Sequence, residues 1–295
     1  MAEEKPRQFV GKTEFKKGLE GAITNESSIS YVDGANGKLI YRGFSIDDLC
    51  AGGGGFEETA YLLIDGELPT KAQLGAFSKD LAGRRAIPQE VKDLITLVGS
   101  RTHPMNTLRT AVSVLGCLNT KEFEVNVEND LDIAMSLTAQ FPTVVAAIQR
   151  VRNGQSILDP DPSLGHSEDF MRMMTGEAAD PRTAEVMDMA LIIHAEHGMN
   201  ASTFSAMVTN SSLTDMYSSI CAGIGSLKGP LHGGANEATL NTFLEIEDPA
   251  KTDEWFAAAK EKKQKVMGFG HRVYKAYDPR AVIFDPIAKE FAERA

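Results

Sequence analysis

Apolar residues recur at helical spacing along most of this chain, from residue 56 to residue 227. A repeat of three and four residues places these side chains on one face of a helix. Breaks rich in turn-forming residues separate the segments, such as Asp-Pro-Asp-Pro at 159–162 and Asp-Pro at 180–181. The pattern predicts helices over residues 56–64, 74–81, 91–98, 106–118, 131–151, 167–174, 181–194, 202–211 and 215–227. Because strands do not alternate with these helices, the sequence argues against a Rossmann-type parallel sheet.

Residues 28–44 carry the one convincing β-hairpin pattern. Two short runs of strand-forming residues surround an Asp-Gly and an Asn-Gly pair, which favour tight turns. Ser45 then stands where a helix N-cap is expected, with Asp48 three residues later. The predicted fold class is therefore all-α, with a small N-terminal β-hairpin.

Charge and cysteine content argue against several classes of protein. The 295 residues have a formal net charge of −11, whereas a nucleic-acid binder needs an excess of Lys and Arg for phosphate contacts. Cys50, Cys117 and Cys221 are odd in number and too far apart for a disulfide framework or a CxxC metal site. The charged N-terminus has no signal-peptide pattern, and no run of about eighteen apolar residues predicts a membrane span. We therefore expect a cytoplasmic protein with no nucleic-acid and no membrane partner.

The most basic stretch of this acidic chain surrounds a histidine. Between Lys260 and Arg280 the chain holds seven Lys or Arg residues against two acidic ones. His271 lies in this stretch after a Gly-Phe-Gly segment, and Arg280 follows nine residues later. Cations around a titratable ring predict a site that binds a small anion and does proton chemistry on it. The Gly-Phe-Gly segment is too short for a phosphate-binding fingerprint, and the lysines are equally compatible with a solvated charged face.

Two further segments place histidines where a ligand could be held. His194 and His197 are three residues apart, without the i, i+4 spacing of a zinc-protease helix, so the pair argues against a metal site. Because Gly198 and Asn200 follow His197, we expect that histidine at a helix end facing a cavity. His232 lies in a Gly/Pro-rich loop that opens a helix near residue 235. Such a loop brings backbone N–H groups close to a ligand, but it also fits an ordinary turn with an exposed ring.

Together these segments resemble the citrate synthase family. Gly229–Asn236 is similar to the first catalytic-histidine loop of the family, and Gly268–Arg280 is similar to its signature, including the histidine-to-arginine spacing. His194–Asn200 resembles the oxaloacetate-binding helix end. Tyr31–Gly43 and His103–Thr110 resemble N-terminal landmarks of the short bacterial and archaeal forms. The resemblance runs from about residue 18 to the end of the chain.

The resemblance implies a fold of two helical domains and a homodimer. A large helical domain with the N-terminal hairpin would span residues 1–233. A small domain would span residues 234–295, without the C-terminal remainder of the family fold. The two substrates would meet in the cleft between the domains, which closes to exclude water.

The resemblance also implies a reaction, in which acetyl-CoA and oxaloacetate condense through an enol(ate) to give citrate and CoA. His232 would donate a hydrogen bond to the developing enolate, and His271 would polarise the oxaloacetate ketone. The substrate-binding set implied by the family comprises His194, His197, Asn200 and Arg280. Residues implied to cradle CoA are Lys265, Val266, Met267, Gly268, Gly270, Arg272 and Lys275. No metal and no permanently bound cofactor are implied, since acetyl-CoA and CoA are substrate and product.

One family feature has no counterpart in the sequence. The base of the family is an aspartate roughly fifty residues beyond the second histidine, where it removes the methyl proton of acetyl-CoA. Asp285, Glu290 and Glu293 follow His271 too closely to match it. We therefore expect the 295-residue chain to lack a complete active site.

Three alternatives stay open on the sequence. A 2-methylcitrate synthase uses propionyl-CoA with the same histidine motifs, and one methylene changes binding by only roughly 1–3 kcal/mol. A non-catalytic scaffold would explain the missing base, although the intact set of His197, His232, His271 and Arg280 argues against it. The remaining class is a helical metalloprotein, which the spacing of the histidines does not favour.

Overall fold

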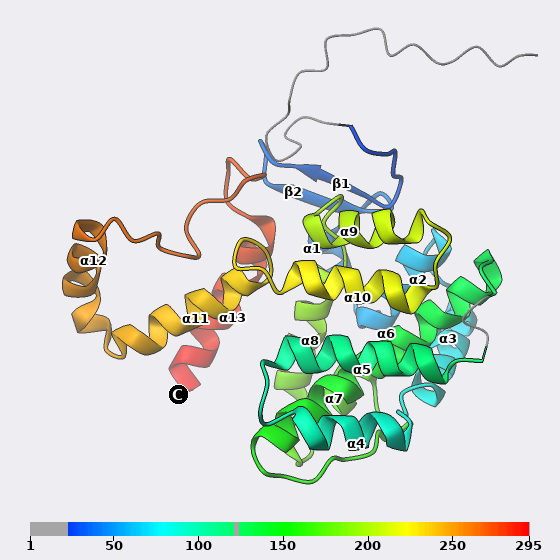
Figure 1. Ribbon diagram of the computed structural model, residues 1–295. Helices are drawn as coiled ribbons and strands as arrows, with labels where there is room; N and C mark the ends of the chain where they lie inside the picture. Colours follow the sequence, from blue (N-terminus) through cyan, green and yellow to red (C-terminus); the bar gives the residue numbers. More distant parts are fainter. Residues whose placement is uncertain (1–22, 121–123, 295) are drawn as a thin grey trace, which may run out of the picture.

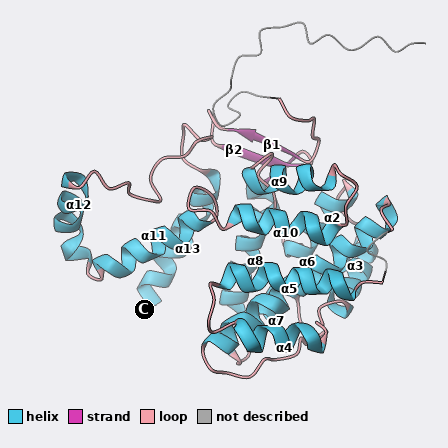
Figure 2. Cartoon of the chain, in the orientation of Figure 1, coloured by secondary structure: helices cyan, strands magenta, loops and turns pink. Residues whose placement is uncertain are grey.

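The computed structural model describes residues 23–120 and 124–294. The charged N-terminus and the first residues of the family resemblance lie outside this part of the chain. The described residues form helices around one small sheet, which confirms the predicted all-α class (Figure 1). Figure 2 shows the strands at one edge of the helical body.

The predicted hairpin is present at that edge. Strands β1 (Ser30–Asp33) and β2 (Lys38–Tyr41) pair antiparallel, with Ser30 opposite Tyr41. A third strand that the sequence did not predict, β3 (Phe44–Ser45), pairs with β2. The hydroxyl of Ser45 accepts a hydrogen bond from the Asp48 N–H at 3.1 Å, which confirms the predicted N-cap.

All nine predicted helices form. After α1 (Ile46–Ala51), they are α2 (Gly55–Asp65), α3 (Lys71–Gly83), α4 (Gln89–Val98), α5 (Pro104–Leu118), α6 (Val127–Arg152), α7 (His166–Thr175), α8 (Pro181–His194), α9 (Ala201–Asn210) and α10 (Met216–Leu227). The largest differences are at the first residues of α3 and α6. Both helices start earlier than predicted because Thr70 and Asn126 act as N-caps. Helix boundaries thus follow the caps rather than the apolar face.

Two buried clusters build the core. The larger lies among α4, α5, α6 and α10 and includes Val91, Ile95, Val112, Ile133, Val144 and Ile224. The smaller joins the hairpin to α1, α2 and α8 through Leu39, Tyr41, Leu49, Leu62 and Ile192. The hairpin is therefore held by burial of its own apolar side chains against the helices.

Helix α6 is more apolar than the sequence analysis suggested. Among the described residues it is the one helix that is long and apolar enough to cross a membrane, by length and composition alone. Half of its apolar window is buried inside the protein, and the helix packs against α4, α5 and α7. A core helix meets the same test, and this packing is that of a core helix.

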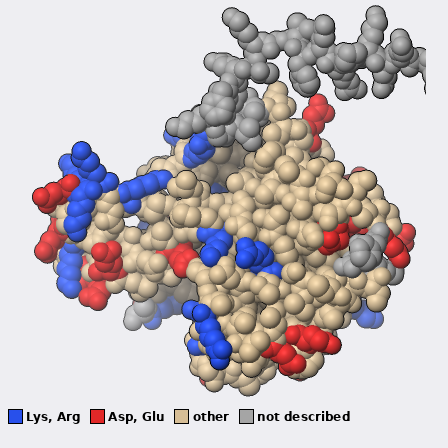
Figure 3. All heavy atoms as spheres, viewed as in Figure 1, with Lys and Arg blue, Asp and Glu red and all other residues tan. Residues whose placement is uncertain are grey.

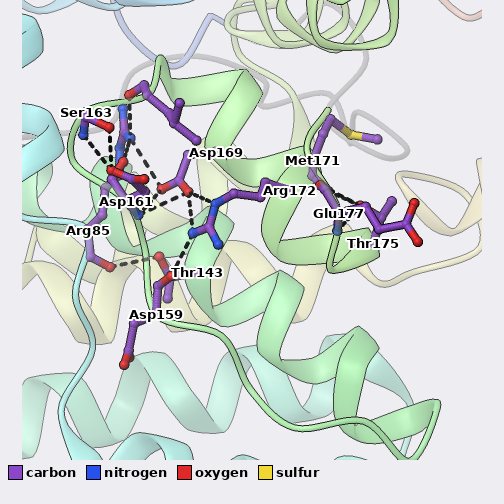
Figure 4. A network of polar contacts seen from close by, with 11 residues as sticks. Arg85, Thr143, Asp159, Asp161, Ser163, Asp169, Met171, Arg172, Thr175 and Glu177 are labelled. Atoms are coloured by element: carbon purple, nitrogen blue, oxygen red, sulfur yellow. Dashed lines mark hydrogen bonds and ion pairs between the residues drawn. The ribbon is translucent and has the colours of Figure 1, made fainter. Parts of the chain in front are cut away.

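A buried ionic network ties α7 to the segments beside it (Figure 4). The carboxylate of Asp169 is fully buried and lies 3.3 Å from Nη1 of Arg85, which is 2 % exposed. Nη2 of Arg172 donates to the same carboxylate at 2.7 Å, and the backbone N–H of Asp161 does so at 3.1 Å. Thr143 on α6 donates to the Arg85 carbonyl at 2.8 Å. The charges are thus paired inside the protein, where an unpaired charge would be costly.

The last part of the chain leaves the helical body and returns to it. Helix α11 (Gly234–Ile246) begins where the sequence predicted a helix start, but α12 (Thr252–Glu261) and α13 (Pro279–Arg294) were not predicted. Figure 1 shows α11 and α12 projecting from the body, and an orange segment running back to the hairpin before α13. Helix α13 packs on α1, and Arg182 on α8 forms an ion pair with Glu290 at 2.7 Å. The proposed domain boundary at residue 233 stays a prediction.

Candidate active site

The segment between α12 and α13, residues 262–278, carries His271 and is called the His271 loop below. Two of its glycines have left-handed backbone angles, with φ of 89° at Gly268 and 79° at Gly270. A Cβ on Gly268 would also lie 3.1 Å from the side chain of Thr239 on α11. Glycine therefore lets the loop turn sharply while its backbone packs against α11.

The backbone of the loop fixes the protonation pattern of His271. Nδ1 of the ring accepts hydrogen bonds from the N–H groups of Val273 and Tyr274, both at 3.1 Å. Burial lowers the pKa of His271, with Asp278 opposing the effect, so the ring is neutral at pH 7. Because Nδ1 is an acceptor, the proton of the neutral ring is on Nε2. His271 thus offers one N–H donor to a ligand.

His197 meets the His271 loop at Tyr274. Its Nε2 lies 3.0 Å from the Tyr274 hydroxyl, and its ring centroid lies 5.8 Å from that of His271. Burial lowers the pKa of His197 to about 4, reinforced by the charge of Arg280. The structure therefore brings His197 and His271 together as two neutral rings. His197 lies in the segment between α8 and α9, three residues after the last residue of α8, and its predicted place facing a cavity stays a prediction.

Arg280, at the start of α13, completes this group. Its guanidinium lies 5.8 Å from the centre of the Tyr274 ring. Nε and Nη2 donate to the two carboxylate oxygens of Asp278 at 2.9 and 2.6 Å. Burial works against ionisation of Asp278, but its hydrogen bonds to Arg280 hold the pKa of the carboxyl below its usual value. The pair fixes the plane of the guanidinium beside the two histidines.

His232 lies apart from this group, in the turn between α10 and α11. Its Nε2 lies 3.2 Å from the backbone N of Ser202 and 2.8 Å from the Ser202 hydroxyl, at the first turn of α9. A backbone N–H can only donate, so Nε2 of His232 is an acceptor and the neutral ring carries its proton on Nδ1. Burial lowers the pKa of His232, which favours this neutral form.

Asn200 supports His232 through the same helix end. Its side-chain oxygen caps α9 by accepting from the N–H groups of Ser202 and Thr203 at 3.1 and 3.0 Å. Since Asn200 lies three residues after His197, one short segment connects the two groups of site residues. Ser202 was not selected from the sequence, although it lies only two residues after Asn200.

His194 is the predicted site residue that the structure brings to neither group. Its side chain is exposed at the end of α8, and Nδ1 lies 2.7 Å from the Ala190 carbonyl of the same helix. Glu196, which the sequence analysis did not select, holds this segment instead. Its carboxylate accepts from the Ser30 hydroxyl at 2.9 Å and from the Gly198 N–H. These contacts attach the His197 segment to the hairpin.

All seven residues predicted to cradle CoA lie in the His271 loop. Lys265, Arg272 and Lys275 are exposed, and the backbone N–H of Lys275 donates to the Gly34 carbonyl at 2.7 Å. Figure 3 shows lysines and arginines over α12 and the following loop, interspersed with acidic residues. In the described part of the chain, no three His, Cys, Asp or Glu residues gather as a metal site.

Comparisons with known proteins agree with this architecture. The family model "Citrate synthase, C-terminal domain" matches residues 18–295. The citrate synthase of Deinococcus radiodurans is 42% identical over 278 residues, which cover 94% of this chain and 74% of that protein. A 2-methylcitrate synthase of Mycobacterium tuberculosis is 40% identical, over 95% of this chain and 70% of that protein.

Similarity extends to solved structures. The citrate synthase of Thermoplasma acidophilum, in a ternary complex with carboxymethyl coenzyme A and oxaloacetate, superposes with a TM-score of 0.91. It is 35% identical in sequence, and the match covers 95% of this chain and 74% of that chain. Because both the sequence and the fold agree over nearly the whole length, this chain belongs to the citrate synthase family and is an enzyme of the citrate synthase type.

Proposed function

We propose that the protein condenses acetyl-CoA with oxaloacetate and, with water, releases citrate and CoA. The observation that carries the proposal is that two neutral histidines accept backbone hydrogen bonds through different ring nitrogens. His271 accepts backbone N–H groups at Nδ1, whereas His232 accepts one at Nε2. Each ring therefore keeps one N–H free of the backbone as a donor, and the reaction needs two such donors.

The first donor is needed when acetyl-CoA loses a methyl proton. Negative charge then develops on the thioester oxygen, and a donor at that oxygen lowers the barrier. We assign this role to Nδ1–H of His232. Because backbone and hydroxyl groups of Ser202 hold the opposite ring nitrogen, little reorganisation is needed at the moment of reaction.

The second donor is needed when the enolate carbon attacks the ketone of oxaloacetate. We assign Nε2–H of His271 to the ketone oxygen, where it polarises the carbonyl and then protonates the alkoxide. Arg280 and His197 lie beside it and would hold the substrate carboxylates and carbonyl groups. The cationic residues of the His271 loop would meet the phosphates of CoA.

We assign the base to none of Asp285, Glu290 and Glu293, which follow His271 too closely to match the family pattern. Asp285 is paired with Lys289 at 2.6 Å, and Glu290 is paired with Arg182 at 2.7 Å, so both carboxylates are engaged in ion pairs. These contacts support the prediction that neither is the base. Its location stays a prediction from the family pattern.

Thiol release from acetyl-CoA in the presence of oxaloacetate tests the reaction, using the protein at its full natural length. We expect His232→Ala and His271→Ala to lower kcat by at least about 100-fold, as loss of a transition-state donor does. Unchanged kcat in both variants would contradict the donor roles assigned to His232 and His271. Calorimetric titration with oxaloacetate separates an enzyme from a scaffold, because a scaffold would bind none.

Acetyl-CoA is the proposed thioester, with propionyl-CoA as the second candidate because a 2-methylcitrate synthase is among the relatives. Comparing kcat/KM for the two thioesters decides between them.

The proposal includes a cytoplasmic homodimer. Exposed apolar residues on α9, α10 and the turn between them, such as Val208, Leu213 and Leu227, support such an interface. Sedimentation velocity measures the oligomeric state directly.

A further inference from the structure

Tyr274 is buried at the centre of the site, yet the proposed chemistry gives it no role. Its side chain is 4 % exposed, although the neighbouring residues of the His271 loop are open to solvent. A buried tyrosine hydroxyl usually has a hydrogen-bond partner, and the identity of that partner indicates what the residue does.

Tyr274 contacts every residue assigned to oxaloacetate in the group around it. Its hydroxyl lies 3.0 Å from Nε2 of His197, and its backbone N–H donates to Nδ1 of His271 at 3.1 Å. Its ring lies 4.9 Å from the His271 ring at a tilt of 36°, and Arg280 lies over its face. One residue therefore contacts His197 through its side chain and His271 through its main chain.

The two contacts differ in what a substitution can remove. The bond to His271 comes from the backbone N–H and survives any substitution other than proline. The bond to His197 depends on the Tyr274 hydroxyl, which lies 77 positions from His197 in sequence and is the atom that meets Nε2. Without that hydroxyl the His197 ring would lose its partner at Nε2 and could rotate about its terminal torsion, which has a broad preference.

We propose that Tyr274 is a positioning residue for oxaloacetate, whose hydroxyl donates to Nε2 of His197 and so fixes that ring beside His271 and Arg280. This inference rests on the proposed function. Burial raises the pKa of the Tyr274 hydroxyl to about 12, so it keeps its proton as a donor, and the His197 ring is neutral enough to accept it. Tyr274 touches no reacting atom in this scheme and acts through His197.

Tyr274→Phe tests the inference because it removes the hydroxyl and keeps the ring. We expect KM and the calorimetric Kd for oxaloacetate to rise about 5- to 10-fold, the effect of losing one hydrogen bond of ordinary strength. KM for the CoA thioester should not change, and kcat should change by less than about twofold. Tyr277→Phe is the matched control, since it removes a hydroxyl from the same loop where the side chain is 87 % exposed.

A double-mutant cycle separates positioning from general damage to the loop. In a His197→Ala background, Tyr274→Phe should have no further effect on oxaloacetate binding, because the partner is already absent. Nitrogen NMR of the wild-type His197 ring adds a test without any variant, since it reports whether Nε2 is the unprotonated nitrogen. A protonated Nε2, equal oxaloacetate affinity in Tyr274→Phe, or an undiminished effect in the His197→Ala background would overturn the inference. Failure of the wild-type protein to bind oxaloacetate would instead overturn the proposed function.

Discussion

Gly34 in the hairpin turn lies directly against the Val273 carbonyl of the His271 loop. A Cβ at Gly34 would stand 2.2 Å from the Val273 oxygen, far inside van der Waals contact. The Gly34 carbonyl also accepts the backbone N–H of Lys275 at 2.7 Å. The hairpin turn thus sets the path of the backbone that orients His271. A segment more than two hundred residues away in sequence therefore helps to build the site.

Gly34→Ala should lower kcat/KM while the protein still folds. The added methyl group must displace Val273, whose N–H is one of the two donors to Nδ1 of His271. We expect kcat/KM to fall at least about tenfold, since misplacement of a catalytic group by an ångström is costly. Gly75→Ala is the control, because no atom lies within 4 Å of the added Cβ at this exposed position of α3. Thiol release and thermal unfolding of both variants provide the comparison, and equal activity would contradict the role of the turn.

Loss of the Asp169 carboxylate should strongly destabilise the protein. Asp169→Ala leaves Arg85 as a buried charge without its partner, a change that costs about 3–5 kcal/mol in comparable sites. Asp80→Ala removes an exposed partner of Arg84 and should cost at most about 1 kcal/mol. Urea denaturation gives both free energies of unfolding. Similar values for the two variants would show that the network in Figure 4 contributes no more than a surface pair.

Most of the fold could be predicted because its elements depend on local pattern. The nine helices between residues 55 and 227 carry apolar residues at helical spacing, and that periodicity is visible in the sequence even for α9, which has no fully buried residue. Helix α12 was missed because it buries only Ala259 and exposes Phe256, so it has no clear apolar face. Helix α13 contains Pro286, which reads as a helix breaker.

The site residues also fall into two groups, those that could be predicted from the sequence and those that could not. His197, His232, His271 and Arg280 could be selected because they lie in recognisable short motifs. Supporting residues that act across a long separation in sequence could not, because no local motif connects the two positions. Ser202 lies 30 residues from His232, Tyr274 lies 77 from His197, and Ser30 lies 166 from Glu196. Such pairs are decided by tertiary packing, which no local periodicity encodes.

Stability should fall as the pH drops from about 6.5 towards 4. Burial lowers the pKa of His166 to about 4, and that of His197 likewise, so both rings stay neutral in the folded protein while the unfolded chain takes up protons near pH 6.5. Unfolding therefore takes up protons between about pH 4 and 6.5, so the free energy of unfolding rises with pH over this range. Above about pH 6.5 the two histidines make their full contribution to stability. Urea denaturation at pH 7, 6 and 5 measures the slope. His166→Phe, which keeps an aromatic ring beside Phe56, should reduce this slope, and an unchanged slope would exclude His166 as a cause.

Arg280→Lys should weaken oxaloacetate binding although the charge is kept. The guanidinium uses Nε and Nη2 to bind Asp278 and leaves Nη1 outside that pair for a substrate carboxylate, whereas a single ammonium cannot do both in the same geometry. Losing a charge-assisted hydrogen bond corresponds to a rise in Kd of about 10- to 100-fold. Arg294→Lys on the same helix is the matched control, because Arg294 is half exposed and pairs with Glu290 away from the site. Calorimetry with oxaloacetate should separate the two variants, and comparable affinities would mean that charge alone, without the fixed geometry beside Asp278, is enough to bind the substrate.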